Sequence, residues 1–172
     1  MKLNKNLVFL GMMGSGKSSI GSLVSNKTKL KFIDIDNEIE SKTQMKIAEI
    51  FKKKGEDFFR NLEEKITLRA LKQDNAVISL GGGGFINEVI RDEVLSNHLS
   101  FWLIWDLNTL IYRIKNSKKR PLAYKVENLE LKNLIKKRSK IYSKALFKIK
   151  CDKLTKSEIV DKIIKIYENN KT

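Results

Sequence analysis

The residues with the clearest chemical meaning are eight consecutive positions near the start of the chain, Gly11-Met-Met-Gly-Ser-Gly-Lys-Ser18. They match the pattern Gly-x-x-x-x-Gly-Lys-Ser/Thr, in which glycines let backbone N–H groups turn inward around a phosphate. In this pattern Lys17 neutralises the β- and γ-phosphates of a nucleotide, and the Ser18 hydroxyl binds Mg²⁺. An apolar run before the loop and a helical pattern after it complete the expected setting. The predicted ATP-binding residues of this segment are Gly14, Ser15, Gly16, Lys17, Ser18 and Ser19.

Two carboxylates follow at the end of the next apolar run, Phe32-Ile-Asp34-Ile-Asp36. Alternation along a strand would place Asp34 and Asp36 on one face, at the carboxyl edge where open parallel sheets bind ligands. One acid can then support the Mg²⁺ shell while the other accepts a hydrogen bond from an acceptor hydroxyl. The alternative is that Asp36 only caps the helix that follows.

The phosphate loop alone does not identify the class of nucleotide-binding protein. No glycine has an aspartate three residues before it, and Asn26-Lys-Thr-Lys29 lacks the closing acid of a guanine-binding motif, which argues against a switch GTPase. The apolar run Ala76–Ser79 ends in Ser-Leu-Gly-Gly-Gly rather than in the acid of a larger ATPase. The remaining class is a small-molecule kinase.

These motifs are separated by short apolar runs that alternate with amphipathic segments. Strands are expected over 7–10, 31–34, 76–79, 100–105 and 147–151. Helices are expected over 17–28, 36–74 with a break at Gly55, 87–97, 107–116, 129–144 and 157–169. This order predicts a three-layer α/β fold, a five-stranded parallel sheet flanked by helices, in one domain spanning 1–172. The basic stretch at about 115–128, which holds the only proline, Pro121, is expected to be a mobile lid.

Charge and composition limit the partners. The formal charge is +15, from 35 basic and 20 acidic residues, but lysines scattered along helical segments indicate solvated faces rather than a specific nucleic-acid surface. No stretch approaches the length of about 18 apolar residues that a membrane span needs. The single cysteine, Cys151, excludes an internal disulfide, fits a reducing cytoplasm and is predicted to fill the core. We expect a cytoplasmic monomer without nucleic-acid or membrane partners.

Taken in order, the motifs resemble those of shikimate kinases, a family of P-loop small-molecule kinases with the nucleoside monophosphate kinase fold. The resemblance covers nearly the whole chain. It rests on the phosphate loop, Phe-x-Asp-x-Asp, Phe59-Arg60 with Glu63, Leu80-Gly-Gly-Gly83, Arg120-Pro-Leu122, and Arg138 four residues before Tyr142. It implies transfer of the γ-phosphate of ATP, with Mg²⁺, to the 3-hydroxyl of shikimate, giving shikimate 3-phosphate and ADP in aromatic amino-acid (chorismate) biosynthesis.

The resemblance also implies roles on the acceptor side, in a segment at about 34–64 and beyond it. Asp36 binds the ring hydroxyls of shikimate and is the candidate proton acceptor. Arg60 and Arg138 hold the carboxylate, which agrees with the planar fork that a guanidinium offers to a carboxylate. Gly82 and Gly83 bring a backbone N–H to the substrate.

On the donor side the resemblance assigns three further residues. Arg120 in the lid closes over the transferring phosphoryl group, Arg113 stacks against adenine, and Asp34 lies in the second shell of Mg²⁺. Catalysis then rests on Lys17, Asp36 and Arg120, which position the reactants and neutralise charge. Arg69 and Arg91 have no role in this scheme and are expected at the surface.

Two other functions stay open. One is a kinase of the same shape that acts on gluconate or on a nucleoside monophosphate, since a sugar acid could share the Arg60–Arg138 pair. The other is an ATP-binding module or switch that uses the positive charge to bind nucleic acid.

Overall fold

The computed structural model describes residues 5–117 and 126–170. Within them the chain forms a five-stranded sheet in which every neighbouring pair is parallel, in the order β2-β3-β1-β4-β5. The strands are β1 Leu7–Leu10, β2 Lys31–Asp34, β3 Ala76–Ser79, β4 Leu99–Ile104 and β5 Phe147–Lys150. The predicted five-stranded parallel sheet is confirmed.

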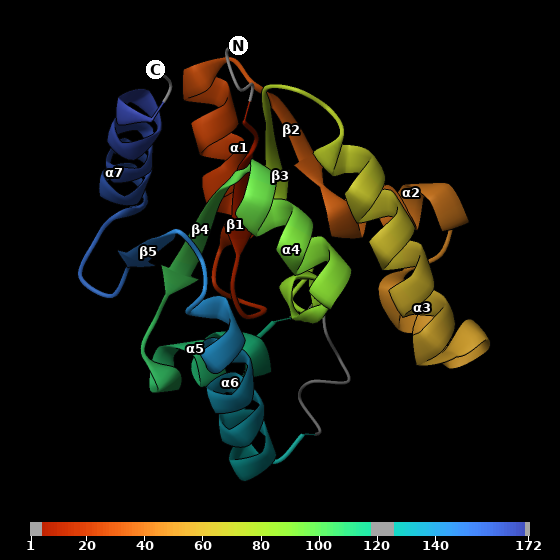
Figure 1. Ribbon diagram of the computed structural model, residues 1–172. Helices are drawn as coiled ribbons and strands as arrows, with labels where there is room; N and C mark the ends of the chain where they lie inside the picture. The colour runs from red at the N-terminus through yellow and green to blue at the C-terminus, as the bar shows by residue number, and fades with distance from the viewer. Residues whose placement is uncertain (1–4, 118–125, 171–172) are drawn as a thin grey trace.

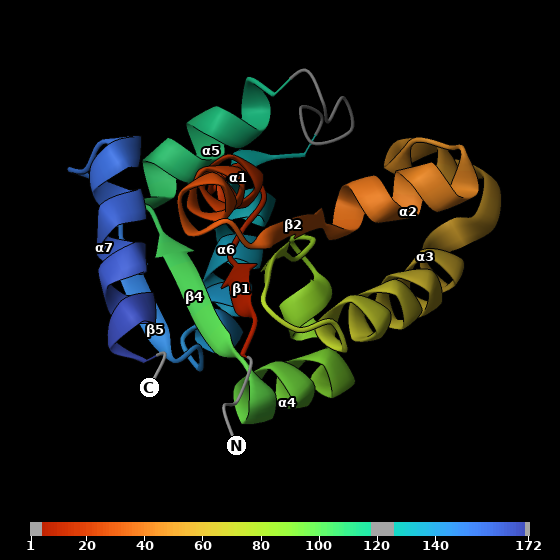
Figure 2. The same ribbon diagram turned by 90° about the horizontal axis from the view of Figure 1, so that it is seen from above.

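Helices follow each strand and cover both faces of the sheet (Figure 1). The α-helices are α1 Lys17–Thr28, α2 Ile35–Thr43, α3 Ile47–Leu71, α4 Glu88–Asn97, α5 Leu107–Lys115, α6 Asn128–Tyr142 and α7 Lys156–Asn169. A 3-10 turn, η1 Gly84–Ile86, follows the glycines after β3. Figure 2 shows α2 and α3 side by side beyond the β2 edge, at the opposite end of the sheet from α7.

The central strand β1 is buried on both faces, and its side chains alternate between two cores. Leu7 and Phe9 pack into the core that α1 and α7 cover. Val8 and Leu10 pack into the other core, which α2 to α6 close. Because successive residues of a strand point to opposite faces, a run of four apolar residues is what a doubly covered strand requires. The strand therefore ends in the middle of the molecule, and the phosphate loop begins there.

The long helical stretch expected over 36–74 is two helices. The first, α2, ends at Thr43 and is followed by the C-cap residue Gln44, which has a left-handed φ of 55°; α3 begins at Ile47. Inside α3, Gly55 has φ 84° and ψ 170°, so the expected break at this glycine is confirmed. The kink gives the segment after Gly55, which carries Arg60 and Glu63, its own direction.

The predicted lid, at about 115–128, extends from the last residue of α5 to the first residue of α6. Its central part, 118–125, which includes Arg120 and Pro121, lies outside the described residues. Across the described ranges, no helix combines the length and the apolarity needed to cross a membrane.

Candidate active site

The phosphate loop doubles back from β1 into α1 through three glycines with positive φ. Gly11, Gly14 and Gly16 have φ of 137°, 78° and 87°, in a region that side chains disfavour. The Nζ of the nearly buried Lys17 donates to the carbonyl oxygens of Gly11 at 2.9 Å and Met12 at 3.0 Å. Ser18 and Ser19 lie exposed in the first turn of α1. The loop thus ends at the amino terminus of a 12-residue helix, where anions bind favourably.

Two side chains from the end of β4 and from α5 contact this loop. The indole N–H of Trp105 donates to the carbonyl oxygen of Ser15 at 2.8 Å. The guanidinium carbon of Arg113 lies 3.7 Å from the centre of the Trp105 ring. The Cβ of Arg113 is 3.4 Å from the position that a Cβ on Gly14 would take. The structure therefore brings the predicted adenine-side arginine next to the phosphate loop, together with a tryptophan that the sequence pattern did not single out.

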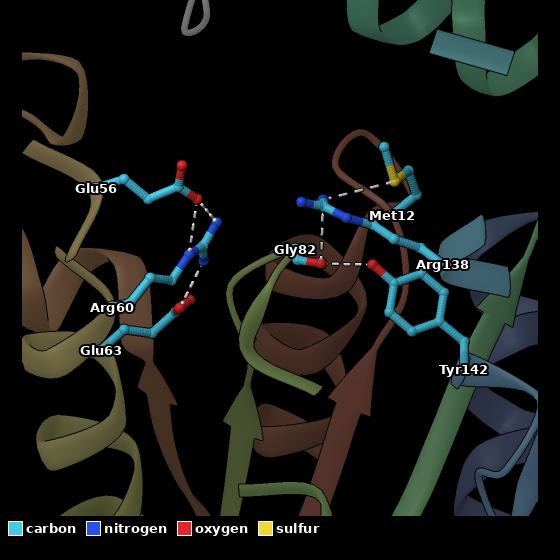
Figure 3. A network of polar contacts seen from close by, with 7 residues as sticks. All are labelled: Met12, Glu56, Arg60, Glu63, Gly82, Arg138 and Tyr142. Atoms are coloured by element: carbon cyan, nitrogen blue, oxygen red, sulfur yellow. Dashed lines mark hydrogen bonds and ion pairs between the residues drawn. The ribbon is translucent and has the colours of Figure 1, made fainter. Parts of the chain in front are cut away.

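A second group forms around the glycine turn after β3. The carbonyl oxygen of Gly82 accepts hydrogen bonds from the Tyr142 hydroxyl and, at 3.4 Å, from Nη1 of Arg138 (Figure 3). The Arg60 guanidinium occupies the position that a Cβ on Gly83 would take, so a side chain at Gly83 would displace that guanidinium. The turn thus brings Arg60 and Arg138, which are far apart in the sequence, to one place.

The two arginines differ in their partners (Figure 3). Arg60 Nη1 forms an ion pair with the buried Glu63 at 2.7 Å, and Nη2 forms one with the exposed Glu56 at 3.3 Å. Arg138 Nη1 instead reaches Gly82 O and, at 4.0 Å, the sulfur of Met12. Among the described residues Arg138 forms no ion pair with a carboxylate. Figure 3 shows its guanidinium directed toward the side of the turn where Arg60 lies.

Carboxylates of Asp36 and Glu63 converge on the same turn. Asp36 Oδ1 lies 2.8 Å, and Glu63 Oε1 2.5 Å, from the position of a Cβ on Gly81. Glu63 is 2% exposed, and its Oε1 has no hydrogen-bond partner among the described residues. Burial raises the pKa of the Glu63 carboxyl, the Arg60 guanidinium opposes that rise, and the Asp36 carboxylate adds to it. The two acids therefore lie close to the arginines, at the carboxyl end of the sheet.

The predicted position of Asp36 on a strand is wrong. Strand β2 ends at Asp34, and Asp36 belongs to the first turn of α2, so the alternation of a strand does not aim it. The capping role belongs to Asp34, whose Oδ1 accepts from the backbone N–H of Asn37 at 3.2 Å. Strand β3 also separates β2 from the phosphate-loop strand β1. A helical turn, not the strand, brings Asp36 over Gly81.

The implied Mg²⁺ needs oxygen ligands near the phosphate loop. The described residues contain no cluster of three or more His, Cys, Asp or Glu side chains suited to a metal. Mg²⁺ at phosphates uses one or two protein oxygens and keeps waters, so it needs no such cluster. The exposed Ser18 hydroxyl at the phosphate loop offers one such oxygen. The role of Asp34 stays a prediction, because its carboxylate is 8% exposed and caps α2.

Three residues outside the predicted set take part in the site: Glu63, Tyr142 and Trp105. Glu63 and Tyr142 appear only as parts of the family pattern, and nothing in the sequence around Trp105 indicates its contact with Ser15.

The expectation for Arg91 was wrong, because it is 9% exposed and donates to the Ile86 carbonyl at 3.0 Å, below the glycine turn. Arg69 is exposed as expected. Cys151 is a core residue as predicted, and burial raises its pKa to about 11.

Comparison with known proteins gives one consistent result. A family model described as shikimate kinase matches residues 13–168. A shikimate kinase from Sulfurihydrogenibium sp. is 41% identical over 160 residues, which cover 93% of this chain and 96% of the relative. The structure of a shikimate kinase from Acinetobacter baumannii in complex with shikimate has a TM-score of 0.89 at 28% identity, with 96% of this chain and 94% of that one covered. The crystal structure of a shikimate kinase from Aquifex aeolicus has a TM-score of 0.85 at 36% identity, with 96% and 97% covered.

Proposed function

This chain belongs to the shikimate kinase family, and we propose that it transfers the γ-phosphate of ATP to the 3-hydroxyl of shikimate, giving shikimate 3-phosphate and ADP. Family members perform this ATP-dependent step in aromatic amino-acid biosynthesis. The proposal treats 1–172 as one domain, with the phosphate loop at 11–18 and the acceptor segment at about 34–64.

The observation that supports this acceptor most directly is the pair of arginines at the Gly82–Gly83 turn. Arg60 already forms ion pairs with two carboxylates. Arg138 instead donates to a carbonyl and a thioether among the described residues. A neutral oxygen or sulfur is a weaker partner than a carboxylate, which can accept two parallel N–H bonds. An acidic acceptor between the two guanidiniums therefore gains the charged hydrogen bonds that Arg138 lacks, and Gly82 and Gly83 line the same place.

Asp36 supplies the acceptor hydroxyl with a hydrogen-bond acceptor. Its carboxylate lies at Gly81, next to the turn that the arginines flank. A carboxylate within hydrogen-bond reach of the hydroxyl orients it for attack and takes its proton as the new O–P bond forms. The buried Glu63 keeps Arg60 in place beside it.

The donor side rests on the phosphate loop. Gly14 to Ser19 are proposed to hold the phosphates, with Lys17 exchanging its bonds to the Gly11 and Met12 carbonyls for phosphate oxygens. Mg²⁺, when bound, offsets charge on the phosphates. Ser18 would bind it directly, and Asp34 would lie in its second shell. Arg113 is proposed to stack against adenine. The role of Arg120 at the transferring phosphoryl group stays a prediction from the sequence.

An acceptor panel tests this function. Purified protein should release ADP from ATP in the presence of shikimate, and far more slowly with gluconate, AMP or CMP. Lys17→Ala is the control and should abolish turnover, because it removes the charge at the phosphates. ADP release that does not depend on shikimate would contradict the proposed acceptor, and a preference for gluconate would move the function to a sugar-acid kinase.

The remaining partner predictions belong to this proposal as well: a cytoplasmic monomer that binds no specific nucleic acid. Size-exclusion chromatography with light scattering tests the monomer. A titration with DNA and RNA at rising salt tests the absence of specific nucleic-acid binding, since binding through the +15 charge alone weakens steeply with salt. Tight binding at physiological salt would contradict it.

A further inference from the structure

Trp105 links two parts of the nucleotide site that are far apart in the sequence. Its indole N–H donates to Ser15 O, across 90 positions of the chain. The Arg113 guanidinium lies over the indole, 3.7 Å from the ring centre, which is the spacing of stacked planes. Tryptophan offers the best aromatic face for such a cation. One rigid side chain therefore contacts both the phosphate loop and the arginine expected at the adenine.

The position of Trp105 is itself well fixed. It lies between β4 and α5 and packs against both hydrophobic cores. The next residue, Asp106, caps α5 by accepting from the backbone N–H of Thr109 at 2.9 Å. The backbone N–H of Asp106 donates to Asp152 Oδ1 at 2.7 Å, which ties this corner to the loop after β5. The indole is thus held on several sides, while Arg113 extends from the last turn of α5 and is only half-buried.

We propose that Trp105 is a positioning residue of the nucleotide-base subsite: it holds the Arg113 guanidinium flat, so that the opposite face of the guanidinium receives the planar ring of the base. This inference rests on the proposed function, within which it names the residue that prepares Arg113. A free arginine side chain samples many rotamers and loses that freedom when it orders against a ligand. An arginine that already lies on an indole has lost much of it beforehand, so the base binds more tightly.

The test compares two ligands by isothermal titration calorimetry: ADP, which carries the base, and inorganic tripolyphosphate, which does not. Trp105→Leu removes the stacking face and should weaken ADP binding about tenfold, while tripolyphosphate binding changes less than about twofold. Trp105→Phe keeps an aromatic face without the N–H donor and should lose less than about threefold for ADP. Tyr112→Leu is the matched control, because Tyr112 is the neighbouring aromatic of α5 and is 70% exposed; it should bind both ligands as the unaltered chain does.

A double variant shows whether Trp105 acts through Arg113. If it does, Arg113→Ala and Trp105→Leu/Arg113→Ala bind ADP equally well, because the second change has nothing left to orient. Additive losses would overturn the proposal. So would equal weakening of ADP and tripolyphosphate by Trp105→Leu, which indicates general damage to the loop, or a Trp105→Phe variant as weak as Trp105→Leu. None of these measurements uses shikimate, so failure of the proposed acceptor would not change their outcome.

Discussion

Arg60 and Arg138 carry the same guanidinium, but their surroundings differ. The Arg60 side chain pairs with a carboxylate that is 2% exposed, whereas Arg138 contacts a carbonyl, a thioether and the Tyr142 hydroxyl among the described residues. Removing Arg60 leaves a buried acid without its countercharge, and losing a hydrogen bond to a charged group costs about 1.5–3 kcal/mol. Removing Arg138 leaves no such group. Both arginines are therefore expected to bind the acceptor, but only Arg60 is expected to contribute to the stability of the folded state.

This difference gives the first prediction. Arg60→Ala and Arg138→Ala should both raise the KM for shikimate at least about tenfold, because each removes a charged bond to its carboxylate. Only Arg60→Ala should also lower the free energy of unfolding, by about 2 kcal/mol. Steady-state kinetics and urea unfolding of both variants measure the two effects. Equal losses of stability would contradict the assignment of Glu63 as the structural partner of Arg60.

The buried Glu63 gives a pH-dependent prediction. Burial raises its pKa in the folded state above the ordinary value of 4.5, so the folded state binds this proton more tightly than the unfolded state does. The stability gained in this way is present below about pH 4.5 and is lost as the pH rises through the pKa of the folded state. Glu63→Gln cannot titrate. The unfolding free energy of the unaltered chain, minus that of Glu63→Gln, should therefore fall as the pH rises above about 4.5.

Glu56→Gln is the matched control for this experiment, because Glu56 pairs with the same arginine but its side chain is 66% exposed. The difference in unfolding free energy between the unaltered chain and Glu56→Gln should vary less as the pH rises. A constant difference for Glu63→Gln, measured by urea unfolding at several pH values, would show that the pKa of Glu63 is not raised.

At the scale of elements, the strands and helices could be predicted because their signals are local. A short apolar run bounded by glycine or a charge defines a doubly covered strand, and β1 and β3 match their predicted ranges without change. Asp36 shows where local patterns end: α2 begins directly after β2, so no loop residue marks the change from strand to helix. Trp105 could not be assigned because its role depends on a contact with Ser15, 90 positions away in the sequence. The phosphate loop could be assigned because its chemistry lies in eight consecutive residues.

The kink in α3 is an element-scale feature with a measurable cost. Gly55 has φ 84° and ψ 170°, a region that is essentially restricted to glycine. Apart from the neighbouring residues of its own helix, no described atom lies within 4 Å of the position that its Cβ would take, so the effect of Gly55→Ala comes from backbone strain. We expect a loss of about 1–3 kcal/mol in unfolding free energy. Thermal or urea unfolding measures it.

The neighbouring Lys54→Ala, on the exposed side of the same helix, is the control and should change the unfolding free energy by less than about 0.5 kcal/mol. If Gly55→Ala were as stable as this control, the chain could straighten at this point. In that case the direction of the segment with Arg60 and Glu63 would not depend on the glycine.

At the scale of the whole molecule, the two ends of the sheet have different tasks. The site residues lie at the carboxyl ends of the strands, after Leu10, Asp34 and Ser79. At the opposite end, before β1, Asn6 is fully buried and joins three backbone groups. Its Nδ2 donates to Leu71 O at 2.9 Å and Gln73 O at 2.7 Å, and its Oδ1 accepts from Ala76 N at 2.9 Å. This one side chain fastens the connection between α3 and β3 to the central strand.

Asn6→Ala should therefore separate stability from function. It removes all three hydrogen bonds and leaves buried backbone groups unpaired, each at about 1–3 kcal/mol, so the unfolding free energy should fall by at least about 2 kcal/mol. Strand β1 is four residues long, or about 13 Å at 3.3 Å per residue, which keeps Asn6 away from the phosphate loop. The KM for ATP and for shikimate should change less than about twofold at temperatures where the variant is folded.

Lys5→Ala, one residue earlier and half-buried, is the control for stability. A large rise in either KM, with the fold intact by circular dichroism, would show that strain at the amino end reaches the site through β1.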